Sequence, residues 1–205
     1  AGLFHTCSLQ TNGTVSCWGG NTYGQSTPPT GMFIQISTGW FHSCGIKNDG
    51  TLACWGNNGA NQATPPIGID FIQVGIGYAH SCGIKTDGTL AWWGSNAWGQ
   101  ASPPPGTFLQ VSGGYEHTCG IQSDGTVACW GRDNNGQLLT PVVTFVQIKS
   151  GGDTICAVGT DGDADCWGRD VDGQASEPDG KFNQVTTGGI HSCGIREDGS
   201  ITCWG

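Results

Sequence analysis

The sequence predicts an all-β fold, a β-propeller of short repeats with at least six blades, the first of them incomplete. Three observations predict this fold. One cysteine recurs at intervals of 37 or 38 residues, and short β-rich segments alternate with glycine-containing turns. In addition, a repeat of this size cannot bury both faces of its own sheet, so it must stack on its neighbours. Radial stacking gives a propeller, whereas a straight stack would need polar capping repeats, which neither end resembles.

Each repeat is expected to hold three strands in a fixed order. The first is of the type "FIQV", the second of the type "HSCGIK" and the third of the type "TLACWG". A turn such as "NDG" separates the last two, and a loop such as "GQASPPPG" leads to the next repeat. The first repeat has only the last two strands, because the chain starts just before "LFHTC". There is no initial Met and no signal-peptide pattern, so we expect a mature form or a fragment of a longer protein, or a ring that closes differently.

The whole chain, 1–205, is therefore expected to form one domain. Its units are a hairpin at 3–19 and five blades at 32–56, 71–94, 108–131, 145–168 and 182–205.

The cysteines are expected to form a disulfide inside each of five hairpins. Cys7 and Cys17 lie symmetrically about Asn12, and a three-residue turn ending at Gly13 would place them directly opposite each other. Such a non-hydrogen-bonded pair has its Cα atoms about 4.5 Å apart, within disulfide range. Each bridge closes a loop of about ten residues, which is worth roughly 2.5 kcal/mol in the chain-entropy model. The five pairs are Cys7–Cys17, Cys44–Cys54, Cys119–Cys129, Cys156–Cys166 and Cys193–Cys203.

Cys82 is the eleventh cysteine, and Trp92 holds its partner position. We expect Cys82 to be a free thiol, with apolar contact to the indole replacing the covalent link. Such cross-strand packing is worth about 0.2–1 kcal/mol, less than a disulfide. The alternative is that Cys82 pairs with a second chain.

The pattern "GxxHSCGIKxDGTLACWGxNxxGQ" resembles the RCC1-type propeller repeat over the whole chain. The residues that show the resemblance are the Trp-Gly pair, the following Gly-Gln and the Gly-x-x-His start. The short repeat and the "PP" loops are most similar to bacterial extracellular members, including the propeller β-lactamase inhibitor proteins, and the paired cysteines to plant crinkly-type receptor ectodomains. The resemblance implies seven blades, although this chain shows five full blades and one hairpin. Nuclear members bind chromatin and act on a small GTPase, but their charge and compartment do not fit this chain.

Composition excludes several function classes. The formal net charge is −9, with seven Lys and Arg that are not clustered, which argues against nucleic-acid binding and a polybasic membrane contact. No apolar run is long enough to span a membrane. Eleven cysteines in a loop-rich acidic chain indicate an oxidising compartment, so we expect an extracellular or cell-surface protein. No catalytic constellation or cofactor motif is present, so no enzyme and no cofactor is expected.

Two patterns offer metal ligands. Histidines occupy the slot two residues before the first cysteine in five repeats, where a histidine and two thiolates could contribute to a metal site. We favour a structural histidine that hydrogen-bonds between blades. Asp161, Asp163 and Asp165 alternate as in a calcium loop, but Cys166 and Trp167 follow where that loop needs other residues. No metal site is therefore predicted. The histidines are His5, His42, His80, His117 and His191.

The positions that vary between repeats predict the functional site. Two slots carry unrelated residues, the pair before each histidine and the residue two before each Gly-Gln glutamine, and both lie in loops. Aromatic side chains in loops on a rigid scaffold are typical of a binding face, and in the inhibitors that this chain resembles they contact the partner protein. We expect a binding module for a protein partner; the alternatives are a structural or adhesive subunit that binds copies of itself, and a lectin-like module. The candidate residues are Trp40, Phe41, Tyr78, Tyr115, Trp98 and Tyr23.

Overall fold

The computed structural model describes residues 2–205, which form seventeen strands and no helix. Accordingly, this part of the chain has no helix that is long and apolar enough to cross a membrane. The strands are β1 (His5–Leu9), β2 (Val15–Gly19), β3 (Phe33–Thr38), β4 (His42–Lys47), β5 (Leu52–Gly56), β6 (Phe71–Ile76), β7 (His80–Lys85), β8 (Leu90–Gly94), β9 (Phe108–Gly113), β10 (His117–Gln122), β11 (Val127–Gly131), β12 (Phe145–Ser150), β13 (Thr154–Gly159), β14 (Ala164–Gly168), β15 (Phe182–Thr187), β16 (Ser192–Arg196) and β17 (Ile201–Trp204).

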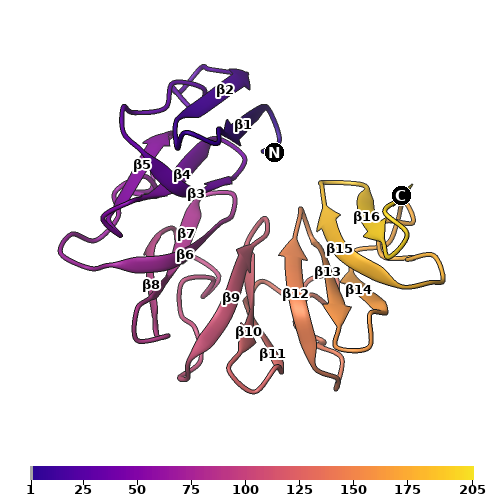
Figure 1. Cartoon of the computed structure of the whole chain (residues 1–205). Helices are drawn as coiled ribbons and strands as arrows, with labels where there is room; N and C mark the ends of the chain where they lie inside the picture. Colours follow the sequence, from indigo (N-terminus) through magenta and orange to yellow (C-terminus); the bar gives the residue numbers. More distant parts are fainter. Residues whose placement is uncertain (1) are drawn as a thin grey trace.

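Six antiparallel sheets follow one another in chain order around an arc, with the two termini on either side of its opening (Figure 1). The first sheet is the hairpin β1–β2, and each of the other five has three strands. The strands β3, β6, β9, β12 and β15 contact one another in succession, so they line the axis. The predicted propeller of six blades with an incomplete first blade is confirmed.

The hairpin register brings the cysteines together as predicted. Cys7 lies opposite Cys17, and the same pairing recurs in four other blades. All five disulfides are formed, with Cα separations of 4.0–4.1 Å. Gly13 adopts φ 83° in the first turn, and the Asn12 carboxamide accepts a hydrogen bond from the Thr14 amide. The turn chemistry therefore fixes the register that makes each bridge possible.

The core lies between blades. Ile46 and the Cys44–Cys54 bridge of one blade pack against Phe71 and Trp93 of the next, and equivalent clusters recur along the arc. The framework tryptophan of the first blade has no such cover, since Trp18 is 56% exposed whereas Trp55 is 7% exposed. At the other end Ile201, on the cysteine-bearing face of the sixth blade, is 72% exposed.

Hydrogen bonds also link each blade to the next. The carbonyl oxygen of Gln62 accepts from the Ser81 hydroxyl at 3.0 Å and from the Trp93 indole at 2.8 Å. The Ser81 oxygen in turn lies 2.9 Å from His42 Nε2. Because the hydroxyl proton is directed at Gln62, the imidazole must donate this bond and is the neutral Nε2–H tautomer. His5, His42 and His80 thus hydrogen-bond to the next blade, as the sequence indicated, whereas His117 forms no such bond within the described residues.

Cys82 is the exception in the third blade. It lies opposite Trp92 in the register and is a free, buried cysteine. Its side chain packs against Phe108 and Val111 of the next blade, and burial raises its pKa to about 12. Trp92 is 46% exposed, whereas Cys82 is 4% exposed. A thiol in this position is neutral and shielded from a second chain.

Candidate functional site

The variable positions lie on one rim of the propeller. Each strand next to the axis ends at this rim, and the middle strand begins there after a short turn. The outer strand returns to it and continues into the loop that holds the Gly-Gln pair. Backbone hydrogen bonds join turn and loop, for example from Asn57 N to Phe41 O at 2.8 Å. Both sets of candidate residues therefore share this surface, which we call the aromatic rim.

Six rings on this rim form one continuous group, the aromatic cluster. The Phe41 ring stacks on Phe4 at 5.1 Å between centroids and meets Tyr78 at 6.0 Å. Trp40 lies 5.1 Å from Tyr78 and 4.7 Å from Tyr115. Contacts of this kind add about 0.5–1.5 kcal/mol each beyond area burial. The cluster spans the first four blades and consists of Phe4, Tyr23, Trp40, Phe41, Tyr78 and Tyr115.

The rings of the aromatic cluster remain accessible. Phe4 and Tyr23 are about half exposed (52% and 51%), and the other four members are partly buried against one another. They do not enter the core between blades, where the framework Phe and Trp rings lie. Sequence analysis placed five of the six members and missed Phe4, which occupies the same slot as Phe41. That shared slot was the signal that could have identified it.

Trp98 lies on the same rim but outside the aromatic cluster. The Arg132 guanidinium sits 5.4 Å from the centroid of its ring and pairs with the Glu116 carboxylate at 2.9 Å. This cation–π and ion-pair arrangement orders a side chain that is otherwise 52% exposed. Trp98 therefore forms a second aromatic position beside the cluster.

At the variable positions, the backbone is held by hydrogen bonds that recur from repeat to repeat, and the side chains take no part in these bonds. The Gln25 carboxamide oxygen accepts from Tyr23 N at 2.8 Å, and Gln100 does the same for Trp98 N. The same bond holds Asp172 N to Gln174 in the last blade, so it does not depend on the side chain at that slot. A rim built in this way presents different side chains from an unchanged scaffold.

The rim changes character along the arc. The later blades carry carboxylates in the slots that hold rings in the earlier blades. Both guanidiniums on this side are paired, Arg132 with Glu116 and Arg169 with Asp172 at 3.0 Å. The rim thus has an aromatic sector and an acidic sector. The carboxylates in these slots are Glu116, Asp153 and Asp172; Asp133 and Asp170 lie in the same loops, at the position that is Asn21, Asn58 or Asn96 in the earlier blades.

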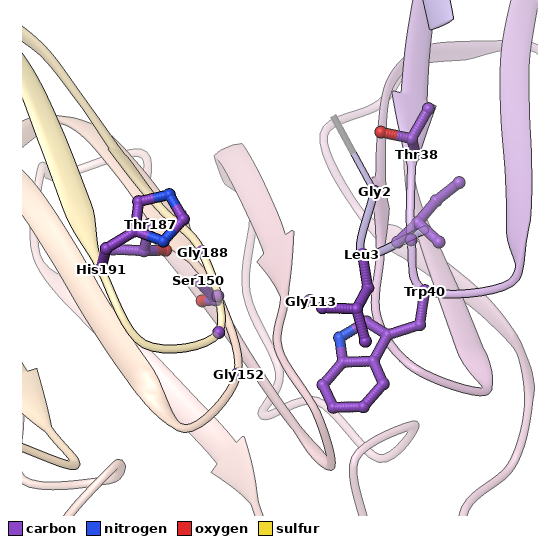
Figure 2. Close-up of a pocket in the computed structure, with 14 residues that line it drawn as sticks. Gly2, Leu3, Thr38, Trp40, Gly113, Ser150, Gly152, Thr187, Gly188 and His191 are labelled. Atoms are coloured by element: carbon purple, nitrogen blue, oxygen red, sulfur yellow. The ribbon is translucent and has the colours of Figure 1, made fainter. Parts of the chain in front are cut away.

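A cavity of about 170 Å³ opens on the axis at this rim (Figure 2). Trp40 and Leu3 line it from one side, and Thr187 and His191 line it from the other. Several glycines of the inter-strand turns complete the wall, which keeps it narrow and largely backbone in character. A second cavity, of about 180 Å³, continues along the axis and shares Thr38, Ile76, Gly113, Ser150 and Thr187 with the first.

The histidines do not assemble a metal site. His42, His80 and His117 are buried singly, one per blade, and burial lowers their pKa values to about 3, 4 and 3. The cysteines beside them are in disulfides or, at Cys82, shielded. Among residues 2–205, no three His, Cys, Asp or Glu side chains are grouped to hold an ion.

The aspartate triplet likewise serves the turn and a salt bridge. The Asp161 carboxylate accepts from Asp163 N at 3.0 Å, the usual role of the turn Asp in this repeat. Asp163 pairs with Lys181 Nζ at 2.9 Å, and Asp165 lies in β14 opposite Ala157. Asp161 therefore stabilises the turn, Asp163 forms a salt bridge, and Asp165 is a strand residue.

Comparison with known proteins identifies the repeat. The profile described as "Regulator of chromosome condensation (RCC1) repeat" matches residues 1–25, 33–62, 108–137 and 145–174, more than half of the chain. The chain belongs to the RCC1-repeat family. No curated protein sequence matches it.

Solved structures show the same RCC1 propeller. The entire ectodomain of the receptor kinase CR4 from Physcomitrella patens is 26% identical with a TM-score of 0.87, and the match covers 98% of this chain and 60% of that one. The CRINKLY WD40 ectodomain of the Arabidopsis thaliana receptor kinase ACR4 is 24% identical, with a TM-score of 0.84 and coverage of 98% and 76%. Prp20p from Saccharomyces cerevisiae is 17% identical, with a TM-score of 0.87 and coverage of 100% and 70%. The chain thus spans about 60% of the moss ectodomain.

Proposed function

We propose that this RCC1-repeat chain is an extracellular or cell-surface binding module that recognises a protein partner through the aromatic rim. The observation that carries the proposal is the aromatic cluster, six touching rings from four blades that stay at the surface. Tyr and Trp are enriched among the residues that dominate binding energy at protein interfaces. Their backbones are held by the framework, so little ordering is needed on binding.

The disulfides support the location. Five bridges in one chain are typical of an oxidising compartment, and the two receptor-kinase relatives are ectodomains. The bacterial subtype that the repeat resembles stays a prediction.

A protein is the ligand class that the rim favours. The acidic sector disfavours a nucleic acid, whose phosphates would meet carboxylates. Propellers of the same fold also bind proteins: Prp20p is described with binding properties to Gsp1p and histones, and in complex with Kap60. These two comparisons, at 17% identity, bear on the fold alone, so the argument for this chain rests on the cluster.

Two alternatives remain open. A structural or adhesive subunit would bury the aromatic rim against copies of itself, and would elute as an oligomer in size-exclusion chromatography with light scattering. A lectin-like module would lose its binding when free sugars compete. We expect a monomer whose binding is unaffected by sugars.

The test measures partner affinity with rim variants. A partner is first isolated on the immobilised protein and purified, and its Kd is then measured by calorimetry. We expect Trp40→Ala to weaken binding at least tenfold, about 1.4 kcal/mol, because the substitution removes the ring that joins Tyr78 and Tyr115. Ile67→Ala is the matched control, since Ile67 is 95% exposed in a proline-containing loop outside the cluster. Equal affinities for wild type and Trp40→Ala would refute the proposal.

A further inference from the structure

The axial cavity contains a lysine that the proposed function does not use. Lys149 lies on β12, in a slot that holds small residues in the other four strands next to the axis. All five residues of this slot line the cavity of about 180 Å³. Lysine is therefore the one large, charged side chain in a ring of small neighbours, which are Ser37, Gly75, Ser112 and Thr186.

The Lys149 ammonium lacks a counter-charge in the described part of the chain. The cavity lining includes no Asp or Glu, and none of the four salt bridges involves Lys149. Four of the six other basic side chains, Lys85, Arg132, Arg169 and Lys181, are in ion pairs. The remaining two are Lys47 and Arg196, and neither lines the cavity. Burial also lowers the Lys149 pKa. Lys149 is partly buried, so its ammonium loses part of its hydration without gaining a partner, and a bound anion would offset that penalty.

The wall around Lys149 supplies hydroxyl donors. Ser37, Thr38, Ser112 and Thr186 line the same cavity together with Thr187. Ser150 lines it as well, but its hydroxyl donates to Ser112 O at 3.3 Å. Among these, the Thr187 Oγ1 atom is buried and has no hydrogen-bond partner within residues 2–205, although nearly all buried polar side-chain atoms have one. Thr187 also lines the outer cavity, so this residue lies where the two cavities join.

We propose that the axial cavity is a binding site for a small oxyanion, a phosphate or a carboxylate, held by the Lys149 ammonium and the surrounding hydroxyls. Ammonium and hydroxyl groups form charge-assisted hydrogen bonds with such oxygens. The volume limits the ligand to a small one, because pockets for drug-sized molecules measure about 300–1,000 Å³. The anion enters through the outer cavity at the aromatic rim, between Trp40 and His191 (Figure 2). The lining of the inner cavity includes no residue of the aromatic cluster, so anion binding does not depend on the proposed protein partner, although Trp40 lines the entrance.

The test titrates inorganic phosphate and acetate into the purified oxidised chain at constant ionic strength set with chloride. Binding is followed by calorimetry and by the shift in unfolding temperature. Because the chain carries a net charge of −9, general attraction of anions to its surface is not expected, and saturable binding indicates a local site. Saturation by phosphate, by acetate or by both supports the proposal and identifies which oxyanion the cavity takes.

Variants locate the site. We expect Lys149→Met, which keeps the length of the side chain, to weaken binding at least tenfold, and Thr187→Val to weaken it severalfold. Lys85→Met is the matched control, since Lys85 pairs with Asp87 away from the cavity at 3.8 Å, and its affinity should stay within twofold of wild type. The proposal is overturned if neither anion binds wild type more tightly than chloride does, or if Lys149→Met and Lys85→Met bind alike. Thr187→Val keeps the test valid should Lys149→Met fold poorly.

Discussion

Acidification from pH 7 to pH 5 is expected to destabilise the propeller through its buried histidines. His42, His80 and His117 have folded pKa values of about 3, 4 and 3, against 6.5 when unfolded. The cause is burial, and the Nδ1 atoms of these rings have no hydrogen-bond partner among the described residues. As the pH falls, these histidines therefore take up protons in the unfolded chain before they do so in the folded chain.

The sign and size follow from linkage. The folded pKa lies below the unfolded pKa, so the stability is fully present above pH 6.5 and is lost as the pH falls from there toward the folded values. Between pH 7 and pH 5 each histidine costs roughly 2 kcal/mol, and the three together about 6 kcal/mol. The turn aspartates, exemplified by Asp49, act in a lower window: the Thr51 hydroxyl lowers the Asp49 pKa below 3.8, so its contribution is lost only at still lower pH.

The assay is chemical unfolding at a series of pH values, from which the slope of the unfolding free energy against pH is obtained. His117→Leu is the informative variant, because Ile155 fills the slot of the hydroxyl partner and both nitrogens of His117 are unsatisfied. We expect it to reduce the slope by one proton, about 1.4 kcal/mol per pH unit, without loss of stability at pH 7. His191→Leu is the control at an exposed site. A wild-type slope below that of one histidine would refute the reasoning, as would an unchanged slope in His117→Leu.

Two further substitutions test the repeat framework. Trp92→Cys should form a sixth disulfide with Cys82, because the two positions are paired in the same register as the other bridges; the mass should show no free thiol, and the free energy of unfolding should rise by about 2.5 kcal/mol. A persistent free thiol would contradict this. Trp130→Phe should cost about 2 kcal/mol, since it removes the 2.9 Å bond to Gln100 O and part of a buried ring, whereas the exposed Trp18→Phe should cost less than about 0.5 kcal/mol; similar losses would contradict the role of that bond.

Much of this fold was predictable because the information is local. The three-residue turn around Asn12 fixes the register, and the register alone decides that Cys7 faces Cys17. Because the sequence repeats, the same turn and register recur and pair the two cysteines in four other hairpins. Likewise, the two variable slots predicted the candidate rim, since variation within a fixed framework marks positions freed from packing.

Other features could be recognised only from the three-dimensional structure. The contact between Phe4 and Phe41 joins two blades, and only the angle between those blades brings the rings together at 5.1 Å. Lys149 reads as an ordinary strand residue in the sequence, and it becomes unusual only because five strands converge on the axis. The unpaired His117 follows from Ile155 in the next blade, 38 residues away, which the sequence analysis did not connect with it.

The hydrogen-bond framework leaves the side chains of the proposed binding rim out of the bonds that hold the fold together. Gln25 has two framework partners: its carbonyl oxygen accepts from the Trp55 indole of the next blade, and its side-chain oxygen accepts from the Tyr23 amide in the variable slot. Stability therefore depends on Gln25 and Trp55, while the side chain of Tyr23 carries none of the framework bonds. The opposite rim lacks this separation, because its turns need specific residues such as Asp49 and Gly50 to form at all. If the aromatic rim binds the partner as proposed, substitutions in the rim would change the partner while the blades, bridges and interblade bonds stay the same.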